Sequence, residues 1–169
     1  MAAVRSAHVV AVLDVDEDGV IPYIVCELVR GETLVQRQAS APLSVTASLA
    51  VVADVAAALS AVHQHGVVHR DVKPENIFLT SEGQTKLSDF GLARECSSQT
   101  AITATGLIMG TPDFMAPEQV TGAPLTEATD QFSLGVVAFW LCAGSVPYPS
   151  ASALEAALAR LNGTAPAPS

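Results

Sequence analysis

The sequence predicts an α+β fold, because short β-type runs are combined with two strongly apolar helical stretches. Residues 8–13 and 23–28 are rich in β-forming side chains, and the Asp18-Gly19 pair between them is a turn signal, so they predict a hairpin. Residues 43–65 and 132–141 have the apolar content of buried helices. The chain of 169 residues has room for one domain with a hydrophobic core.

The first long helix is predicted from the spacing of its apolar residues. Ser44 and Thr46 stand at its start as candidate caps, and Gly66 follows it as a stop signal. Apolar side chains recur at three- and four-residue intervals, which places them on one face: Leu49, Val52, Val55, Ala56, Leu59 and Val62. We therefore expect a helix with one buried face that leads into the next loop.

Short β-type runs flank that loop. Residues 67–68 precede it and residues 77–79 follow it, and residues 85–87 are expected to pair with the latter run across a turn at 81–83. Residues 92–115 are small and polar without periodicity, which is typical of a surface loop. These features predict a rigid loop followed by a long irregular segment.

The last part of the chain is predicted to be mostly helical. Residues 132–141 are apolar on every side, which predicts a helix buried all round. Residues 150–161 read as a final amphipathic helix, and residues 162–169, with two prolines, as an irregular tail.

Charge and cysteine content exclude several functions. With 8 basic and 17 acidic residues and a net charge of -9, the chain has no electrostatic basis for binding nucleic acid or an anionic membrane. Three widely spaced cysteines fit a chain whose thiols are reduced. The apolar runs are either too short to span a membrane or are interrupted by a charged residue, Asp54. We expect a cytoplasmic location, although a longer gene product could carry a membrane anchor.

Two loops carry the candidate chemistry. His69-Arg70-Asp71 is followed by Lys73 and Asn76 in one loop, and Asp89-Phe90-Gly91 follows the next β-type run. Ala116-Pro117-Glu118 comes later, and Thr111 and Asp130 stand at fitting positions. In this order the motifs resemble the signature set of the eukaryotic-type (Hanks-type) Ser/Thr protein kinases of bacteria. The resemblance extends from about His8 to Leu161, and four motifs in register make it specific.

The resemblance implies a truncated protein-kinase-like fold. Residues 1–26 would end a β-rich N-lobe, 27–32 would form the hinge, 33–161 an incomplete and mostly helical C-lobe, and 162–169 the tail. No GxGxxG motif occurs, and the first lysine is Lys73, so the glycine-rich loop and the N-lobe lysine of the family have no counterpart in this chain. We therefore expect part of a kinase domain.

The resemblance also implies a role for each motif residue in phosphoryl transfer from ATP. Asp71 would orient and deprotonate the attacking hydroxyl, and Lys73 would lie against the transferred phosphate. Thr111 would hydrogen bond to Asp71 and Lys73 and favour a Ser or Thr as the phosphate acceptor. Asn76 and Asp89 would hold Mg²⁺ through hard oxygen ligands.

The stretch after the second β-type run resembles the hinge that binds adenine. By that match Cys26 guards the back of the pocket, Glu27 and Val29 offer a main-chain acceptor and donor, and Glu32 reaches the ribose. Phe78 matches the apolar residue under the adenine, while Lys73 and Asp89 face the phosphates. The alternative for residues 26–32 is a plain strand end that runs into a capped helix.

Further residues match regulatory positions of the family. Arg70 would pair with a phosphorylated activation loop, with help from Arg94. Thr103 and Thr105 stand where bacterial relatives carry autophosphorylated threonines, so we predict them as phosphorylation sites.

Other residues match structural positions. His69 and Phe90, next to Gly91, would belong to the internal stack that links the lobes, and Asp130 would brace the backbone of the His-Arg-Asp motif. Glu118 would pair with an arginine near the end of the domain. Arg160 is the only arginine after Glu118 in this sequence, and it falls in a different helix from the one that carries the partner arginine in the family.

Three functional readings follow. The first is a partial sequence of a genuine Ser/Thr kinase, with ATP, Mg²⁺ and protein substrates that carry Ser or Thr, and with contact between two kinase chains for autophosphorylation. The second is a degenerate kinase-like protein that only binds a partner. The third, outside the family, is a helical interaction module.

Overall fold

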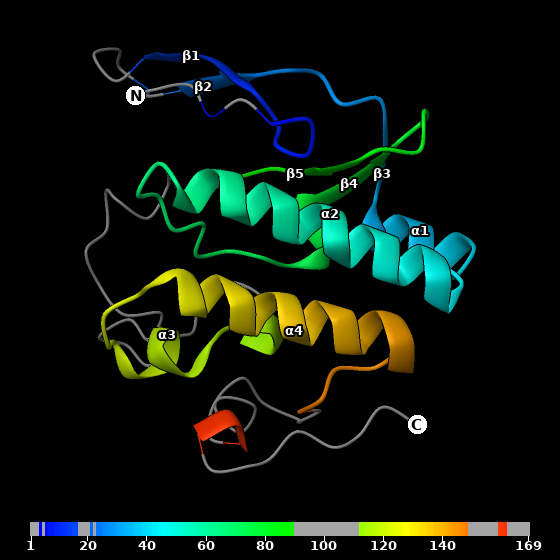
Figure 1. Ribbon diagram of the computed structural model, residues 1–169, viewed down its shortest axis with the longest axis vertical. Coiled ribbons are helices and arrows are strands. Elements are labelled where there is room, and N and C mark those ends of the chain that lie inside the picture. Colours follow the sequence, from blue (N-terminus) through cyan, green and yellow to red (C-terminus); the bar gives the residue numbers. More distant parts are fainter. Residues whose placement is uncertain are drawn as a thin grey trace.

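The computed structural model describes residues 4, 6–16, 21, 23–89, 112–148 and 159–161 (Figure 1). A two-stranded hairpin of β1 (Val12–Asp16) and β2 (Tyr23–Cys26) lies at one end. Below it comes an antiparallel sheet in the order β3 (Gly31–Thr33), β4 (Ile77–Thr80) and β5 (Thr85–Leu87). Helices α2 (Val45–His63) and α4 (Glu127–Ala143) follow in turn (Figure 1). The predicted α+β class is confirmed.

The N-terminal hairpin is shifted relative to its prediction. β1 pairs antiparallel with β2 from Val12↔Cys26 to Asp16↔Tyr23, so the first strand begins later than residue 8. The preceding residues instead run beside β5, where the Val10 N–H donates to the Leu87 carbonyl over 2.9 Å. An apolar run does not reveal which strand it will accompany, and this part of the prediction was wrong. The Asp18-Gly19 pair that signals the predicted turn lies outside the described residues.

The central sheet forms largely as the sequence indicates. β4 and β5 make the predicted hairpin, with Phe78 opposite Lys86, and Gly83 takes a φ of 80° in the turn. β3 adds to β4 at Gly31, where a Cβ would lie 2.1 Å from the Leu79 carbonyl oxygen, so only glycine fits. The predicted strand at 67–68 is wrong: these residues are irregular.

Two consecutive helices are capped by hydroxyl side chains. α1 (Leu34–Ser40) begins at a capping box in which Thr33 and Gln36 satisfy each other's backbone N–H. Ser44 caps the start of α2, because its side chain accepts from the Ala47 N–H. The prediction of Ser44 as a cap is confirmed. The Thr-x-x-Gln pattern could have predicted α1.

One face of α2 is buried against α4 and β5. Val55 and Leu59 are 1% and 3% exposed, whereas Leu49, predicted on that face, is 58% exposed. Ala56, also predicted there, is exposed as well. Leu49 precedes Val55 by six residues, which turns it by about 120° from the buried side. By length and composition α2 is also long and apolar enough to cross a membrane, which differs from the expectation that its apolar run is interrupted at Asp54. Core helices can share these properties, and the buried residues of α2 belong to the hydrophobic core.

The segment before α4 consists of short helical turns. η3 (Pro112–Phe114) and α3 (Pro117–Thr121) lead to Gly122, which ends α3 with a φ of 74°. The Phe114 ring then packs edge-on against Trp140 of α4, with centroids 6.4 Å apart.

α4 is not buried all round, which corrects the prediction from its composition. Val136, Val137 and Leu141 face the core, but Gly135 and Cys142 are exposed. α2 covers one side of the helix, and the described residues leave the other side partly open. Of the predicted final helix, only residues 159–161 are described, and they are helical.

Candidate active site

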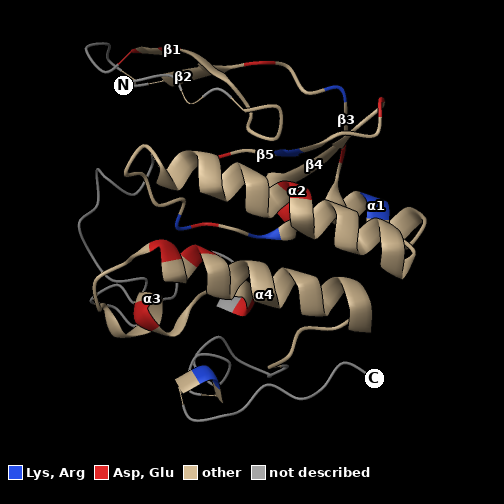
Figure 2. Ribbon diagram, in the orientation of Figure 1, with Lys and Arg blue, Asp and Glu red and all other residues tan. Residues whose placement is uncertain are grey.

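The loop between α2 and β4 carries the first group of candidate residues and runs between α2 and α4. Figure 2 shows basic and acidic residues alternating along it. Arg70 has a φ of 68°, which turns the chain sharply before Asp71. The 3₁₀ turn η1 (Pro74–Asn76) then carries the chain into β4, with Pro74 at its first position.

Asp71 lies at the centre of this group. Lys73 Nζ is 2.8 Å from Asp71 Oδ2, and Asn76 Nδ2 donates to the same oxygen over 3.0 Å. Asn76 Nδ2 also donates to the Asp71 carbonyl over 2.8 Å, which ties η1 back to the loop. The Asp71 side chain is 35% exposed, so this fixed carboxylate can still meet a substrate.

Asp89, at the end of β5, joins the group through its neighbour. Both the N–H and the hydroxyl of buried Ser88 donate to the Asn76 carbonyl, over 2.9 and 3.2 Å. The Ser88 hydroxyl also lies 3.4 Å from Asp89 Oδ2. Asp89 is exposed and has a φ of 56°, a left-handed conformation that aspartate tolerates better than most residues.

The His69 side chain connects the loop of Asp71 to the segment of Ser88 and Asp89. Its side chain is fully buried, and Nε2 donates to the Ser88 carbonyl over 2.8 Å. Nδ1 accepts from the Asp71 N–H over 3.2 Å, and these two partners together fix the neutral tautomer. Burial lowers the pKa of His69, while the Ser88 hydrogen bond and nearby carboxylates oppose that shift. His69 is therefore an uncharged link at neutral pH.

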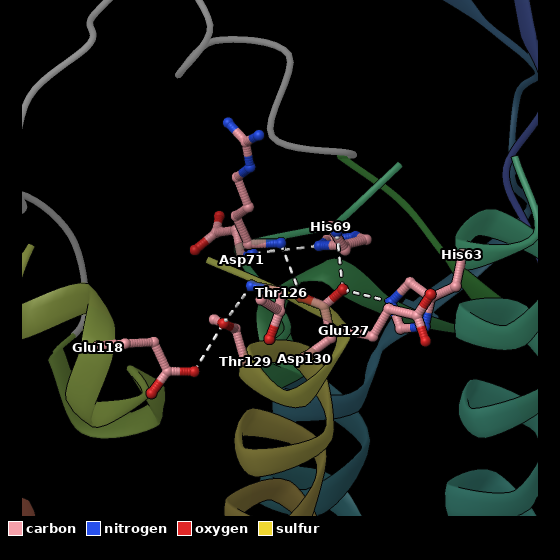
Figure 3. Close-up of polar contacts among 9 residues, drawn as sticks. His63, His69, Asp71, Glu118, Thr126, Glu127, Thr129 and Asp130 are labelled. Atoms are coloured by element: carbon pink, nitrogen blue, oxygen red, sulfur yellow. Dashed lines mark hydrogen bonds and ion pairs between the residues drawn. The ribbon is translucent and has the colours of Figure 1, made fainter. Parts of the chain in front are cut away.

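Asp130, from the first turn of α4, holds the backbone of the same loop (Figure 3). Its Oδ2 accepts from the His69 N–H and its Oδ1 from the Arg70 N–H, each over 2.8 Å. His63, from the last turn of α2, adds a third contact with Nε2 2.7 Å from Oδ2. Asp130 is only 1% exposed, so its position is set by these partners.

A second connection reaches the loop from α3. Gln119 Nε2 donates to the Arg70 carbonyl over 2.8 Å, while its Oε1 accepts from the Ala116 N–H. Its neighbour Glu118 accepts from Thr129 Oγ1 over 2.6 Å (Figure 3). Arg160 is buried, with its guanidinium carbon 5.9 Å from the centre of the Tyr148 ring, and its side-chain nitrogens have no hydrogen-bond partner among the described residues. Thr129 is thus the hydrogen-bond partner of Glu118 in the described part of the chain.

The predicted hinge, residues 27–32, covers the irregular segment after β2 and the first two residues of β3. Glu27 Oε1 is 2.5 Å from Lys86 Nζ and accepts from the Ala11 N–H, and the Lys86 hydrogen bond lowers the Glu27 pKa. Partial burial, followed by the charges of Asp89 and Glu27, raises the pKa of the Cys26 thiol. Cys26 itself is exposed, and its place at the back of an adenine pocket stays a prediction.

Three other predicted nucleotide contacts lie on or beside the central sheet. Val29 is half-buried in the irregular segment before β3. Phe78 pairs with Lys86, whereas Glu32 pairs with Leu79 and therefore belongs to the opposite face of the sheet. The Glu32 carboxylate lies 3.7 Å from Arg37, and its contact with a ribose stays a prediction.

Several predicted site residues lie outside the described residues, and their roles stay predictions: Phe90, Gly91, Arg94, Thr103, Thr105 and Thr111. Conversely, the sequence did not point to His63, Ser88 or Gln119 as parts of the site. Each of these side chains hydrogen bonds to a backbone group or a carboxylate that folding brings close to it from another part of the chain. Their closeness to the motifs was the only available signal.

The structure thus places a lysine-bound carboxylate and a neighbouring amide together, at motif positions that resemble those of the protein kinases. The comparison with protein families agrees, because the protein kinase domain model matches residues 1–165. The chain belongs to the protein kinase domain family.

Its relatives are bacterial Ser/Thr kinases. The chain is 39% identical to the serine/threonine-protein kinase PknL of Mycobacterium tuberculosis over 98% of its length. It is 37% identical to PrkC of Bacillus subtilis and 35% identical to a probable serine/threonine-protein kinase PknB of Lactococcus lactis, in each case over 94% of its length. The chain spans 42%, 24% and 25% of these three relatives, respectively.

Proposed function

We propose that this chain carries the catalytic loop of a Ser/Thr protein kinase that transfers the γ-phosphoryl group of ATP to a protein Ser or Thr hydroxyl. The observation that carries the proposal is the Asp71 carboxylate, held by Lys73 and Asn76 yet open to solvent. Phosphoryl transfer requires mainly positioning and charge neutralisation, and this arrangement can supply both.

Each side chain has a separate task in the proposed reaction. The substrate hydroxyl oxygen attacks the γ-phosphorus, the bond from that phosphorus to the bridging oxygen of ADP breaks, and Asp71 accepts the hydroxyl proton. Lys73, 2.8 Å from Asp71, places a positive charge where the transferred phosphoryl group carries negative charge. The same lysine also keeps the carboxylate directed toward the attacking oxygen.

Asn76 and Asp89 fit Mg²⁺ by the chemistry of their donor atoms. Asn76 uses Nδ2 for both hydrogen bonds to Asp71, which leaves its amide oxygen for a metal. Asp89 contributes an exposed carboxylate. Within the described residues, no three His, Cys, Asp or Glu side chains cluster as a metal site, and Mg²⁺ beside phosphates needs few protein ligands. When bound, the ion neutralises phosphate charge.

The proposal is tested by Mg²⁺-dependent ATP binding to the 169-residue chain in isothermal titration calorimetry. We expect Asp89→Asn to weaken binding in Mg²⁺ by about 10-fold or more, because it removes a charged metal ligand. Asp54→Asn, on α2, is the matched control and should bind as the unmodified chain does. Binding that ignores both Mg²⁺ and the Asp89 change would contradict the metal assignment. Absence of ATP binding would contradict the nucleotide site proposed here.

Transfer by this chain alone is expected to be weak or undetectable. The chain contains neither a GxGxxG loop nor a lysine before Lys73, so two phosphate anchors of the family have no counterpart here. Phosphate incorporation into a generic basic protein measures this. Robust turnover that Asp71→Asn abolishes would support the kinase function and refute the expectation of weak transfer.

A further inference from the structure

Gln119, at the third position of α3, hydrogen bonds to two segments of the chain. Its Oε1 accepts from the Ala116 N–H over 2.9 Å, and its Nε2 donates to the Arg70 carbonyl over 2.8 Å. The residue is 5% exposed, so water has little access to either bond. The reverse orientation of the amide would set two donors and two acceptors against each other, so these partners together fix its orientation.

The helix explains one of these two bonds. A Glu or Gln at the third helical position commonly accepts from the backbone N–H of the N-cap residue. Gln36 does the same for α1, where its Oε1 accepts from the Thr33 N–H over 2.8 Å. Glutamate would cap α3 equally well. The bond from Gln119 to the Arg70 carbonyl requires the amide, because a carboxylate has no hydrogen to donate.

Arg70 adopts a backbone conformation that depends on support from other elements. Its φ of 68° is left-handed, which is strained for a residue with a side chain. Its N–H donates to Asp130 Oδ1 on α4, and its carbonyl accepts from Gln119 on α3, each over 2.8 Å. Because a peptide group is planar, the bond to this carbonyl also sets the direction in which the chain enters Asp71.

We infer that Gln119 is a positioning residue for Asp71. Asp71 lines one pocket together with Phe114 and Met115, the two residues that precede Ala116. Gln119 joins the backbone of that segment to the peptide group before Asp71, so the carboxylate and the other residues of the pocket keep a fixed relation. A displacement of the segment is thereby transmitted to Asp71. The inference rests on the proposed function only for the catalytic meaning of Asp71, since the two hydrogen bonds stand on the geometry.

Two substitutions separate the donor from the helix cap. Gln119→Met keeps the length of the side chain and removes both hydrogen bonds. Gln119→Glu keeps the acceptor for the Ala116 N–H but, when ionised, places a carboxylate against the Arg70 carbonyl in place of a donor. Gln36→Met and Gln36→Glu are the matched controls, because Gln36 caps α1 in the same way at an exposed position.

The first readout is hydrogen exchange of single amides at pH 7.5, followed by NMR without nucleotide. In Gln119→Met we expect three amides to exchange on the order of 10-fold faster, relative to amides within α2 and α4: those of Arg70, Asp71 and Ala116. In Gln119→Glu the Ala116 amide should stay within about 3-fold of the unmodified chain, while the other two exchange faster. Both Gln36 variants should leave all three amides unchanged.

The second readout is the chemical shift of the Arg70 carbonyl carbon, which responds to loss of its hydrogen bond. We expect this shift to change in Gln119→Met and in ionised Gln119→Glu. In Gln119→Glu it should return toward the unmodified value as the pH falls, because a protonated carboxyl can donate again. The ¹³Cδ shift of the new carboxyl reports its ionisation, and the same titration of the unmodified chain corrects for other groups.

Three results would overturn the inference. The first is unchanged exchange at Arg70 and Asp71 in Gln119→Met. The second is an equal acceleration of all core amides in that variant, which would make the contact a matter of global stability alone. The third is unchanged exchange at the same two amides in Gln119→Glu while its carboxyl is ionised, which would leave helix capping as the role of the side chain.

Either variant decides without the other. If the new carboxyl stays protonated at pH 7.5, Gln119→Met gives the answer, and if Gln119→Met does not fold, ionised Gln119→Glu gives it. Because no ATP is present, failure here is distinct from failure of the proposed kinase function.

Discussion

His69 shows how one buried side chain can join the two loops of the candidate site without carrying charge. Its ring donates to the loop that ends in Asp89 and accepts from the N–H of Asp71, and its own backbone N–H is bound by Asp130. Protonation of Nδ1 would place a second donor against the Asp71 N–H and break that contact. The link therefore depends on the neutral form.

This dependence predicts that stability falls on mild acidification. Burial lowers the pKa of His69, so the unfolded chain binds a proton that the folded chain excludes. The contribution of His69 is thus complete above the ordinary histidine pKa of about 6.5 and is lost as the pH falls toward the folded value. Urea unfolding between pH 7.5 and 5.5 should show a slope of up to about 1.4 kcal/mol per pH unit from this residue.

His69→Phe provides the comparison for that slope. Phenylalanine removes the titrating group, while His8, His63 and His65 are present in both proteins. The variant will be less stable at every pH because it loses two hydrogen bonds, so the slopes are compared and not the absolute values. Equal slopes would show that His69 does not titrate differently on folding.

At the residue scale, the motif positions were predictable because they lie close together in the chain. Asp71, Lys73 and Asn76 fall within six residues, and the structure brings their side chains together. Gln119 and His63 were not predictable in the same way, since their partners Arg70 and Asp130 are 49 and 67 residues away. Such contacts depend on how α2, α3 and α4 pack, which no local pattern encodes.

At the scale of elements, periodicity predicted where helices occur better than which side they bury. The α2 helix was predicted within two residues of its observed ends, but Leu49 was placed on the wrong face. The α4 helix is so apolar that its sequence shows no preferred side, and only its packing against α2 exposes Gly135 and Cys142. The buried face of an apolar helix is decided by its neighbours.

The two leucines of α2 test this assignment of faces. Leu59 lies in the core against α4, so Leu59→Ala should lower the free energy of unfolding by about 2–5 kcal/mol through lost burial and a cavity. Leu49→Ala, at an exposed position of the same helix, should change it by less than about 0.5 kcal/mol. Urea unfolding of both variants measures the difference. Similar losses at the two positions would mean that Leu49 is covered in solution.

At the scale of the whole molecule, the N-terminal hairpin is attached to the rest by few contacts. Both β1 and β2 are exposed along nearly their whole length, and side chains such as Leu13, at 64% exposed, face solvent. Backbone hydrogen bonds join residues 8 and 10 to Leu87, and the Glu27–Lys86 pair adds a side-chain connection beside the predicted hinge. The hairpin therefore depends on this junction for its position over the site.

The charge of Glu27 determines when that side-chain connection exists. The Lys86 hydrogen bond lowers the Glu27 pKa below its usual value, so the pair is complete at neutral pH and is lost as the pH falls through the folded pKa. Partial exposure of both side chains limits its contribution, because solvent screens the charges. A local effect on the hairpin is expected and not a loss of the fold.

Removal of the lysine charge should accordingly loosen the hairpin alone. In Lys86→Met we expect amides of β1 and β2 to exchange about 2- to 5-fold faster at neutral pH, with α2 and α4 unaffected. Both helices contribute to the hydrophobic core, which contains no described residue of β1 or β2. Arg37→Met is the matched control: it breaks an ion pair with Glu32 in which both side chains are 40% exposed, and it lies away from the hairpin. Hairpin exchange that is the same in both variants would show that the backbone contacts to Leu87 suffice, and that the hinge needs no side-chain support.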